Sequence, residues 1–428
     1  MRILVVGGGG REHALLWALR RDLPRATLFA APGNPGTARL ATNLEVEATR
    51  LDRIVEAVEE HRIDLTVVGP EAPLAAGLAD RLRSRGRLVF GPSEAAARIE
   101  SSKAFAKDVM ARAGVPAAPG RSFTDLGAAL GYIASHAEPL VVKASGLAGG
   151  KGAVVCATRA EAGDVARAML AEGRFGDAGR EVVIEDFLEG EELSVLALTD
   201  GEQILLLPPA QDHKRLGEGD TGPNTGGMGA YCPVSLATPA LLERVRRQVF
   251  EPTLGELAAR GAPYSGVLYA GLMIAPDGTP YVLEFNCRLG DPEAQAVLPA
   301  APPGIARHLV EIAEGRWRPG AAALPAVRAA VTTVLAAAGY PARPEVGATI
   351  VLPDDLGPDV LVFHAGTVRD PEGRLRVGGG RVLNLTGLGG TVPQAAARSR
   401  EAASRVRFSG MQYRRDIAWR EVRRAGAA

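Results

Sequence analysis

Lysine is the rarer source of positive charge in this chain, and its positions give the first indication of chemistry. It occurs only at positions 103, 107, 143, 151 and 214, whereas arginine is spread along the whole length. A lysine ammonium is a compact charge suited to phosphate oxygens, while the guanidinium of arginine is a planar fork. We therefore expect these lysines to serve phosphate binding, with Lys107 as a bystander on a helix surface.

Two of these lysines, Lys143 and Lys151, flank a glycine-rich segment. Four glycines lie within residues 146–152, so the backbone is free to close over an anion. Short apolar runs at 139–142 and 153–156 precede and follow the segment. They predict a loop at the tip of a β-hairpin, which can act as a lid, rather than the strand-to-helix turn of a Walker phosphate loop.

A pair of hard oxygen ligands ends an apolar strand further along the chain. Glu284 and Asn286 are two residues apart, so their side chains point to the same side of a strand. Magnesium prefers oxygen ligands and keeps water and phosphate oxygens in its remaining positions. The pattern Glu-x-Asn-x-Arg, which ends at Arg288, therefore predicts a metal site.

Two polar stretches could line the same cleft. Residues 211–229 are rich in glycine and in charge and show little periodicity, and such a long irregular insertion is usually functional. The acidic run Glu185–Leu193 joins two apolar strands. Some of its backbone groups must then lie in an interior cleft, where they could read the edge of a purine.

Besides the glycine-rich segment at 146–152, the N-terminus offers another site where an anion could bind. Gly7–Gly10 separate a short strand from a helical pattern, and free N–H groups at such a turn attract anions. A dinucleotide fingerprint would need glycine or alanine where Glu12 stands, and no acidic residue follows the strand at 26–31. An NAD-dependent dehydrogenase of the Rossmann type is thus a disfavoured alternative.

The elements that must position these residues alternate along the chain. Helices at 51–61 and 73–85 alternate with strands at 2–6, 26–31, 64–68 and 88–90, which predicts a small parallel sheet with Glu71 on its rim. A compact α/β stretch at about 121–197 carries the glycine hairpin. A helix at about 239–260 and two strands, 266–274 and 281–285, follow it. From about Gly320 we expect a third α/β unit, in which we identify no catalytic constellation.

Composition narrows the class of protein. A chain of 428 residues calls for two to four domains. The formal net charge of zero gives no general electrostatic reason to bind nucleic acid or an anionic membrane. The three cysteines form no CxxC pair, and no apolar run reaches the roughly 18 residues that span a bilayer. We expect a soluble cytoplasmic protein with neither a nucleic-acid nor a membrane partner.

Several segments together resemble one enzyme family. They are GGGGREH (7–13), APGNPGT (31–37), VGPEAPL (68–74), SKAF (102–105), the loop 143–152, QDHK (211–214), DTGPNTGGMGAY (220–231), LEFNCRLGDPE (283–293) and YRRDIAWR (413–420). They are similar to the phosphoribosylamine-glycine ligases, or glycinamide ribonucleotide synthetases, of the ATP-grasp superfamily. The glycine loop and Glu-x-Asn indicate only the superfamily, whereas QDHK and DTGPNTGGMGAY indicate the family.

The resemblance implies an α/β ATP-grasp fold with an N-terminal parallel-sheet domain (1–102), an ATP-grasp domain (103–315) with a small α/β lid subdomain (about 121–192), and a C-terminal α/β domain (325–428). It also implies ATP-dependent ligation of glycine to 5-phosphoribosylamine through glycyl phosphate, in purine biosynthesis. ATP and Mg²⁺ or Mn²⁺ would be needed. Transient contact with the enzyme that makes the unstable phosphoribosylamine is a further expectation.

The resemblance also implies roles for individual residues. The ATP-binding set is Lys103, Lys143, Gly149, Gly150, Lys151, Gly152, Glu185, Asp186, Phe187, Leu188, Glu191 and Glu192. The metal ligands are Glu284 and Asn286. The catalytic set is Arg288, Asp291, Asp212 and Lys214. The substrate-binding set is Gly9, Gly10, Arg11, Glu12, Asn34, Pro35, Gly36, Thr37, Glu71, His213, Asn224, Gly226, Gly227 and Met228.

This chain departs from the family pattern in two places. The family often has Asp and Ala where Ser145 and Gly149 stand, so neither side chain can be essential for phosphate binding. Many ATP-grasp enzymes also place a second carboxylate on the strand before Glu-x-Asn, and residues 267–274 contain none. A second metal ion would then depend chiefly on phosphate oxygens. Another carboxylate-amine ligase of purine synthesis is the alternative within the superfamily.

Overall fold

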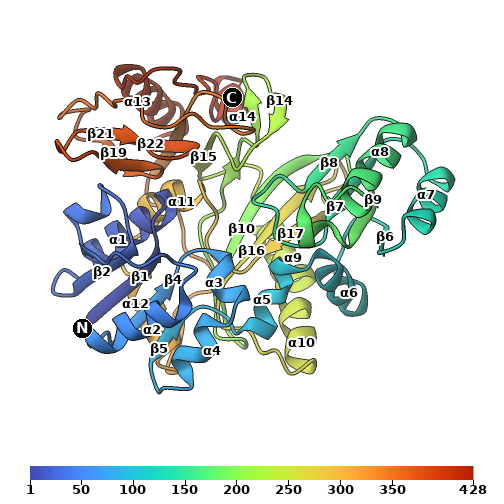
Figure 1. Ribbon diagram of the computed structural model, residues 1–428, viewed down its shortest axis with the longest axis horizontal. Coiled ribbons are helices and arrows are strands. Elements are labelled where there is room, and N and C mark those ends of the chain that lie inside the picture. Colours follow the sequence, from blue (N-terminus) through green and yellow to red (C-terminus); the bar gives the residue numbers. More distant parts are fainter. Residues whose placement is uncertain (428) are drawn as a thin grey trace.

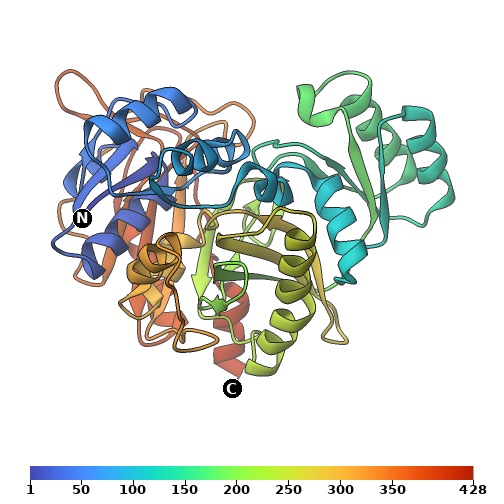
Figure 2. The same cartoon turned by 90° about the horizontal axis from the view of Figure 1, so that it is seen from below.

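The computed structural model describes residues 1–427; residue 428, the last of the predicted C-terminal domain, lies outside the described part. In Figure 1 the N-terminal (blue) and C-terminal (red) parts of the chain lie on one side, and the green segment with β7–β9 lies on the other. Figure 2 shows that this segment projects from the rest of the molecule. Within residues 1–427 no helix is long and apolar enough to cross a membrane.

The N-terminal part folds around a five-stranded parallel sheet in the order β3-β2-β1-β4-β5. Residues 3–6 of its central strand are completely buried, because helices cover both faces of a parallel sheet. This confirms the parallel sheet predicted from the sequence. Its elements are β1 (Arg2–Gly7), α1 (Gly10–Asp22), β2 (Thr27–Pro32), β3 (Thr42–Asn43), α2 (Leu51–Glu60), β4 (Leu65–Val68) and β5 (Leu88–Phe90).

The prediction of a single helix at 73–85 is wrong. The structure has two short helices instead, α3 (Glu71–Ala75) and α4 (Leu78–Arg83). Gly77 between them has a φ of 82°, in the left-handed region that glycine enters without steric cost. The break leaves Glu71 in the first turn of α3, directly after β4.

The projecting segment is a four-stranded sheet in the order β6-β9-β7-β8 with a hydrophobic core of its own. Strands β7 and β8 pair antiparallel from Leu140↔Cys156 to Lys143↔Ala153. The glycine-rich segment is therefore the tip of a hairpin, as predicted. The elements are β6 (Gly120–Phe123), α7 (Leu126–Ser135), β7 (Leu140–Ala144), β8 (Ala153–Cys156), α8 (Arg159–Leu170) and β9 (Val182–Asp186).

A second antiparallel sheet, in the order β11-β10-β16-β17, lies next to it. Two helices lead into the projecting segment, α5 (Glu94–Ser101) and α6 (Lys103–Ala113). The strands are β10 (Glu191–Thr199), β11 (Ile204–Leu206), β16 (Gly266–Ile274) and β17 (Pro280–Asn286). The helix expected at 239–260 comprises α9 (Pro239–Val245), the π-helical turn η3 (Arg246–Phe250) and α10 (Glu251–Ala259). Helices α11 (Ala294–Ala300) and α12 (Ile305–Ala313) follow.

The last sheet, in the order β12-β15-β18-β22-β19, combines distant parts of the chain. Its strands are β12 (Gln211–Asp212), β15 (Gly229–Cys232), β18 (Ala329–Ala336), β19 (Val360–His364) and β22 (Arg381–Gly389), and α13 (Val392–Arg405) packs on it. The C-terminal unit therefore shares its sheet with the polar stretch at 211–232. The sequence predicted that this stretch is irregular, but the structure differs. Strands β13 (Arg215–Gly217) and β14 (Thr221–Asn224) also form a ribbon within it.

Two further elements complete the C-terminal part. Strands β20 (Thr367–Arg369) and β21 (Leu375–Val377) form a two-stranded ribbon. Helix α14 (Trp419–Ala427) ends the described chain and makes contacts with α13. Its Arg424 forms an ion pair with Glu191 at the start of β10, so the end of the chain is tied to the second sheet.

Candidate active site

The base of the glycine hairpin is fixed to the start of helix α6. The backbone carbonyl of Ser145 accepts a hydrogen bond from the N–H of Lys103 at 2.8 Å, and its hydroxyl accepts one from the N–H of Ala104 at 3.1 Å. Ser145 is buried and thus satisfies two N–H groups that a helix N-terminus leaves free. This is a structural role, in agreement with the expectation that its side chain is not needed for phosphate binding.

Three charged side chains meet where the hairpin joins the second sheet. The ammonium of Lys143 lies 2.5 Å from Glu185 Oε2 and donates a hydrogen bond to the carbonyl of Leu283 at 2.9 Å. Lys107 Nζ lies 2.6 Å from the other oxygen, Glu185 Oε1. The expectation that Lys107 is a surface bystander is therefore wrong. Helix α6 packs against β9, a tertiary contact that the sequence pattern does not reveal.

The tip of the hairpin reaches the C-terminal part of the molecule. Gly149 and Gly150 have φ values of 58° and 76°, which glycine adopts readily and other residues only at a cost. Lys151, predicted to contact phosphate, donates a hydrogen bond from its ammonium to the carbonyl of Pro341 at 2.7 Å. The loop is thus held across the cleft by its tip.

The predicted metal ligands lie on β17, and one of them, Glu284, lies opposite a residue without a side chain. Glu284 pairs with Gly271 across β16 and β17, and a Cβ at Gly271 would lie 3.2 Å from the Glu284 side chain. Burial raises the pKa of Glu284, but Lys214, Lys103, Lys143 and Arg288 lower it by more, so its pKa falls below the usual value. The carboxylate is ionised and surrounded by positive charge.

Two of the predicted ATP-binding residues, Glu191 and Glu192, have different partners. Glu191 accepts a hydrogen bond from Gln211 and forms an ion pair with Arg424. Glu192 Oε2 lies 2.7 Å from Lys214 Nζ, which is also 3.9 Å from Glu284 Oε1. Glu192, and not Glu191, therefore shares the Lys214 ammonium with the predicted metal ligand Glu284. The neighbouring Phe187 is exposed.

Among the described residues, no group of three or more His, Cys, Asp or Glu side chains is arranged to hold a metal ion. Glu284 and Asn286 nevertheless provide hard oxygen donors on the same side of a strand. They fit a divalent cation that takes its other ligands from phosphate and water. This agrees with the lack of a second carboxylate on β16.

Glu12 fills the tetraglycine turn. Its Oε2 accepts a hydrogen bond from the N–H of Gly9 at 2.7 Å, and its Oε1 lies 2.6 Å from Arg11 Nε. A Cβ at Gly7 would come within 2.5 Å of the Glu12 side chain. The carboxylate thus occupies the place where a dinucleotide pyrophosphate would bind in a Rossmann site.

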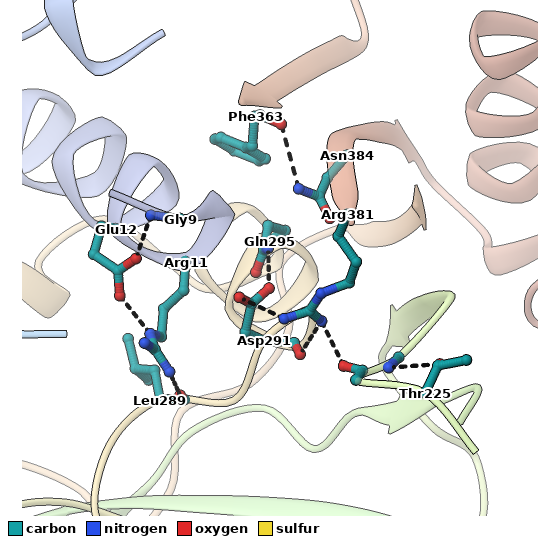
Figure 3. A network of polar contacts seen from close by, with 12 residues as sticks. Gly9, Arg11, Glu12, Thr225, Leu289, Asp291, Gln295, Phe363, Arg381 and Asn384 are labelled. Atoms are coloured by element: carbon teal, nitrogen blue, oxygen red, sulfur yellow. Dashed lines mark hydrogen bonds and ion pairs between the residues drawn. The ribbon is translucent and has the colours of Figure 1, made fainter. Parts of the chain in front are cut away.

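A polar cluster joins four distant parts of the chain beside this turn (Figure 3). Asp291 lies between Arg11 and Arg381, and its Oδ2 is 2.9 Å from Arg381 Nη2. Gln295 donates a hydrogen bond to Asp291 Oδ1 at 2.7 Å, and Arg381 also donates to the carbonyls of Asp291 and Gly226. Although burial raises the pKa of Asp291, Arg381 and Arg11 hold it below its usual value.

The C-terminal residues of this cluster were missed by sequence reasoning. Arg381 and Asn384 both come from β22, and Tyr340 accepts a hydrogen bond from the N–H of Gly226 at 2.9 Å. The side-chain oxygens of Gln295 and Asn384 are buried without a hydrogen-bond partner in the described structure. Arg381 lies outside every segment whose residue pattern indicated a functional site, so nothing in the sequence predicted its place in the cluster.

Arg288 is held by two carboxylates. Its Nη2 lies 2.7 Å from Glu100 and its Nε lies 3.2 Å from Glu71. Burial alone would raise the pKa of Glu71, but Arg288 and Arg11 lower it to about 2. Glu100 was not predicted; it also accepts a hydrogen bond from the N–H of Cys287 at 2.7 Å. This second carboxylate fixes the orientation of the guanidinium.

The QDHK segment places its side chains in different surroundings. Burial raises the pKa of Asp212 well above its usual value, although Lys214 beside it opposes this effect. His213 is buried, and its Nε2 accepts a hydrogen bond from the N–H of Ala418 at 3.2 Å. Burial and Arg414 lower the pKa of His213 to about 3, so the ring is neutral. The N–H of Met228 donates to the His213 carbonyl at 2.8 Å, which closes the loop.

The polar groups of the predicted substrate residues at 34–37 mostly form hydrogen bonds that hold their own turn in place. The side-chain oxygen of Asn34 accepts hydrogen bonds from the N–H groups of Gly36 and Thr37, and its amide donates to the carbonyls of Gly8 and His364. These bonds fix the turn beside the tetraglycine segment. Pro35 lies within the same turn, and Asn224 lies at the end of the β14 ribbon.

Family models and named relatives match almost the whole chain. Three models of phosphoribosylglycinamide synthetase match the chain, the N domain at residues 1–100, the ATP-grasp (A) domain at 101–294 and the C domain at 330–420. A protein of Nostoc sp. named phosphoribosylamine-glycine ligase is 47% identical over 431 residues, with 98% of this chain and 99% of the relative covered. One of Vibrio parahaemolyticus with the same name is 44% identical over 434 residues, with 99% of each covered.

Solved structures of other proteins have the same fold. The crystal structure of the phosphoribosylamine-glycine ligase of Thermotoga maritima is 35% identical, with a TM-score of 0.85 and 97% of this chain and 100% of that chain covered. The biotin carboxylase domain of the Hydrogenobacter thermophilus 2-oxoglutarate carboxylase, in complex with MgADP, is 19% identical with a TM-score of 0.73, and covers 96% of this chain and 91% of its own. At that identity the likeness shows the fold alone.

Proposed function

The chain belongs to the phosphoribosylglycinamide synthetase family, and from this premise we propose how its residues join glycine to 5-phosphoribosylamine at the expense of ATP. The products are glycinamide ribonucleotide, ADP and phosphate, and the chain is an ATP-dependent carbon-nitrogen ligase of purine biosynthesis. Neither the other ligases of that pathway nor a dehydrogenase is favoured. One observation carries the assignment of the site: Glu284 lies within electrostatic reach of Lys103, Lys143, Lys214 and Arg288.

We propose that ATP binds between the projecting segment and the second sheet. Lys103 and Lys143 are placed for its phosphates, because both charges act on Glu284 and the N–H of Lys103 is bonded to Ser145 at the hairpin base. The loop 145–152 covers the phosphates, and Glu185–Leu188 reads the adenine. Glu192 is favoured over Glu191 as the residue near the ribose, because Glu191 is already paired with Arg424.

A divalent cation is required by an enzyme of this family, and Glu284 and Asn286 are the residues that would hold it. It supplies charge neutralisation on the transferred phosphate. The donors are an amide and a carboxylate oxygen without a soft ligand, a set that suits magnesium and manganese alike. A comparison of turnover with each ion as the sole divalent cation would distinguish them.

We propose that glycine and the acyl phosphate lie next to Arg288 and Asp291. Arg288 is fully charged and is held in place by Glu71 and Glu100. Asp291 is ionised between Arg11 and Arg381. A fixed cation suits a carboxylate or an acyl phosphate, and a fixed carboxylate suits an ammonium or amine.

Phosphoribosylamine is proposed to bind on the side of the N-terminal turns. Its anionic phosphate suits the guanidinium groups of Arg11 and Arg381. The unpartnered amide oxygens of Gln295 and Asn384 are acceptors for its hydroxyl groups. The C-terminal domain would thus complete the substrate site.

The reaction needs positioning more than a protein nucleophile. The glycine carboxylate attacks the γ-phosphate, forms glycyl phosphate and releases ADP; the amine of phosphoribosylamine then attacks the acyl carbon and releases phosphate. Asp212 and Lys214 lie beside Glu192 and Glu284. They are placed to accept the proton that the amine loses and to offset charge on the leaving phosphate.

Isotope transfer tests the acyl phosphate. With ATP, glycine labelled with oxygen-18 in its carboxylate and phosphoribosylamine formed in situ, one labelled oxygen should appear in the released phosphate for each product molecule. Label in phosphate should be absent when glycine is omitted and ATP is hydrolysed by contaminants. Unlabelled phosphate accompanied by product would rule out glycyl phosphate while leaving the ligation itself intact.

Two expectations from the sequence remain predictions. Direct transfer of phosphoribosylamine from the enzyme that makes it is expected from the instability of that amine; pull-down of the two purified enzymes would test it. Cytoplasmic localisation is expected from composition and can be tested by cell fractionation.

A further inference from the structure

Glu185 is a buried carboxylate held between two lysines. Its side chain is only 7% exposed, and its two oxygens lie 2.6 Å from Lys107 Nζ and 2.5 Å from Lys143 Nζ. Burial raises the pKa of Glu185, but Lys143 and Lys107 lower it by more, below its usual value. The group is thus an anion at neutral pH with one cation on each oxygen.

The two lysines are fixed in different ways. Lys107 lies one helical turn after Lys103 on α6, so both project from the same face of that helix. Its ammonium also donates to the carbonyl of Ala118, which leads into β6. Lys143 lies at the end of the hairpin strand β7, and its other partner is the Leu283 carbonyl next to Glu284. Lys107 is therefore anchored on the segment before β6, and Lys143 is anchored on the metal strand itself, at the residue next to Glu284.

A conflict follows for Lys143. In the proposed nucleotide site its ammonium serves the phosphates, yet here it is also a counter-ion of Glu185. A buried carboxylate that lost its sole cation would be strongly destabilised. Movement of Lys143 toward a nucleotide is therefore favourable only if a second cation remains at Glu185.

We propose that Lys107 is a positioning residue that neutralises Glu185 and so frees Lys143 for the nucleotide. This inference rests on the proposed function, in which Lys143 contacts ATP. Lys107 itself does not touch ATP. Without Lys107, Lys143 is retained by Glu185, and the affinity for ATP falls while the chemical step at saturating ATP is preserved.

Substitution of Lys107 by methionine tests this role, because methionine keeps most of the apolar stem and removes the charge. Lys107→Met should weaken ATP binding about tenfold, seen both as Kd in calorimetry and as KM for ATP, with kcat changed by less than about threefold. Arg112→Met is the matched control: it removes an exposed cation from the same helix, and its partner is Asp108. It should leave Kd for ATP unchanged.

A double variant separates positioning from mere support of the fold. In a Glu185→Gln background there is no charge to neutralise, so adding Lys107→Met should change the Kd for ATP by less than about twofold. An equal loss in both backgrounds would overturn the proposal, and so would a fall in Tm for Lys107→Met with an unchanged Kd.

Lys143→Met keeps the failure of this inference distinct from failure of the proposed site. If Lys143→Met weakens ATP binding and Lys107→Met does not, only the positioning role of Lys107 is refuted. If Lys143→Met leaves ATP affinity unchanged, the assignment of Lys143 to the nucleotide is refuted, and the role of Lys107 with it.

Discussion

At the scale of single residues, the charges of the cleft converge on Glu284. Three lysines and an arginine act on this one carboxylate, whereas its neighbour across the sheet, Gly271, contributes no side chain. Lys214 Nζ lies 3.9 Å from Glu284 Oε1 and is shared with Glu192. The charge of Glu284 therefore offsets the repulsion between the surrounding cations, and in the proposed site the same carboxylate would supply an oxygen ligand to the metal.

Removal of this charge should disable catalysis without unfolding the protein. Glu284→Gln keeps the shape of the side chain but loses the anion, so we expect kcat/KM to fall about 100-fold or more, because metal-ion stabilisation of transferred phosphate contributes several kcal/mol. Steady-state kinetics across a series of Mg²⁺ concentrations would measure it. Glu202→Gln, an exposed residue in the turn before β11, is the control and should have wild-type activity. An equal loss of kcat/KM in both variants, unchanged by excess Mg²⁺, would contradict the role of Glu284 in binding the metal.

At this scale the sequence singles out a residue where its chemistry and the surrounding pattern coincide. Glu284 interrupts an apolar strand, and Lys103 and Lys143 are rare residues in an arginine-rich chain, so each stood out. Glu100 and Arg381 did not, because their importance arises only from partners about 190 and 90 positions away, Arg288 and Asp291. Lys107 was misjudged for the same reason.

At the scale of elements, the hairpin β7–β8 joins the projecting segment to the rest of the site. Its subdomain has its own core, and its tip contacts the rest of the molecule through Lys151 and the Pro341 carbonyl. Apolar runs on both sides of a glycine cluster predicted the hairpin correctly. The break at Gly77 and the short strands β12–β15 were not predicted, because pattern does not reveal which glycine adopts a left-handed conformation or which polar segment finds a strand partner.

The contact at the tip should protect the reactive intermediate from water. Lys151→Met removes the hydrogen bond to Pro341, so the loop should open more often and glycyl phosphate should hydrolyse. We expect more than one phosphate to be released per glycinamide ribonucleotide, in place of a ratio near one. Parallel assays of phosphate and product would give the ratio. Arg174→Met, which changes an exposed cation in the same subdomain, should keep it near one; an unchanged ratio in Lys151→Met would show that the tip contact does not retain the intermediate.

At the scale of the whole molecule, the C-terminal domain and the middle of the chain share one sheet. Strand β15 pairs with β18 over Gly229↔Thr333 to Cys232↔Ala330, and β12 pairs with β15. The loop between them, which carries Lys214 and Gly226, is thus positioned by the C-terminal core. Composition predicted several α/β units, but not a sheet composed of segments about 100 residues apart, because strand partners are chosen by tertiary packing.

This sharing predicts how stability is distributed. Leu385 in β22 is fully buried in the C-terminal core, and Leu385→Ala should cost about 2–5 kcal/mol. Hydrogen exchange measured by mass spectrometry should show lost protection in peptides at 329–336 and also at 229–232, while strand β9 of the lid subdomain, at 182–186, keeps its protection. The corresponding change in the lid core, Ile184→Ala, should give the reverse pattern. Loss confined to 329–336 would mean that β15 is stabilised independently of the C-terminal core.

The shared sheet also sets a limit on recombination between relatives. A crossover near residue 320 appears harmless in the linear sequence, since it separates the family's A and C domain models. In the folded chain it would pair one parent's β15 with the other parent's β18 and set one parent's Gly226 against the other's Arg381. A functional chimera must therefore inherit residues 211–232 and the C-terminal domain from the same parent, so the heritable unit is discontinuous in the gene.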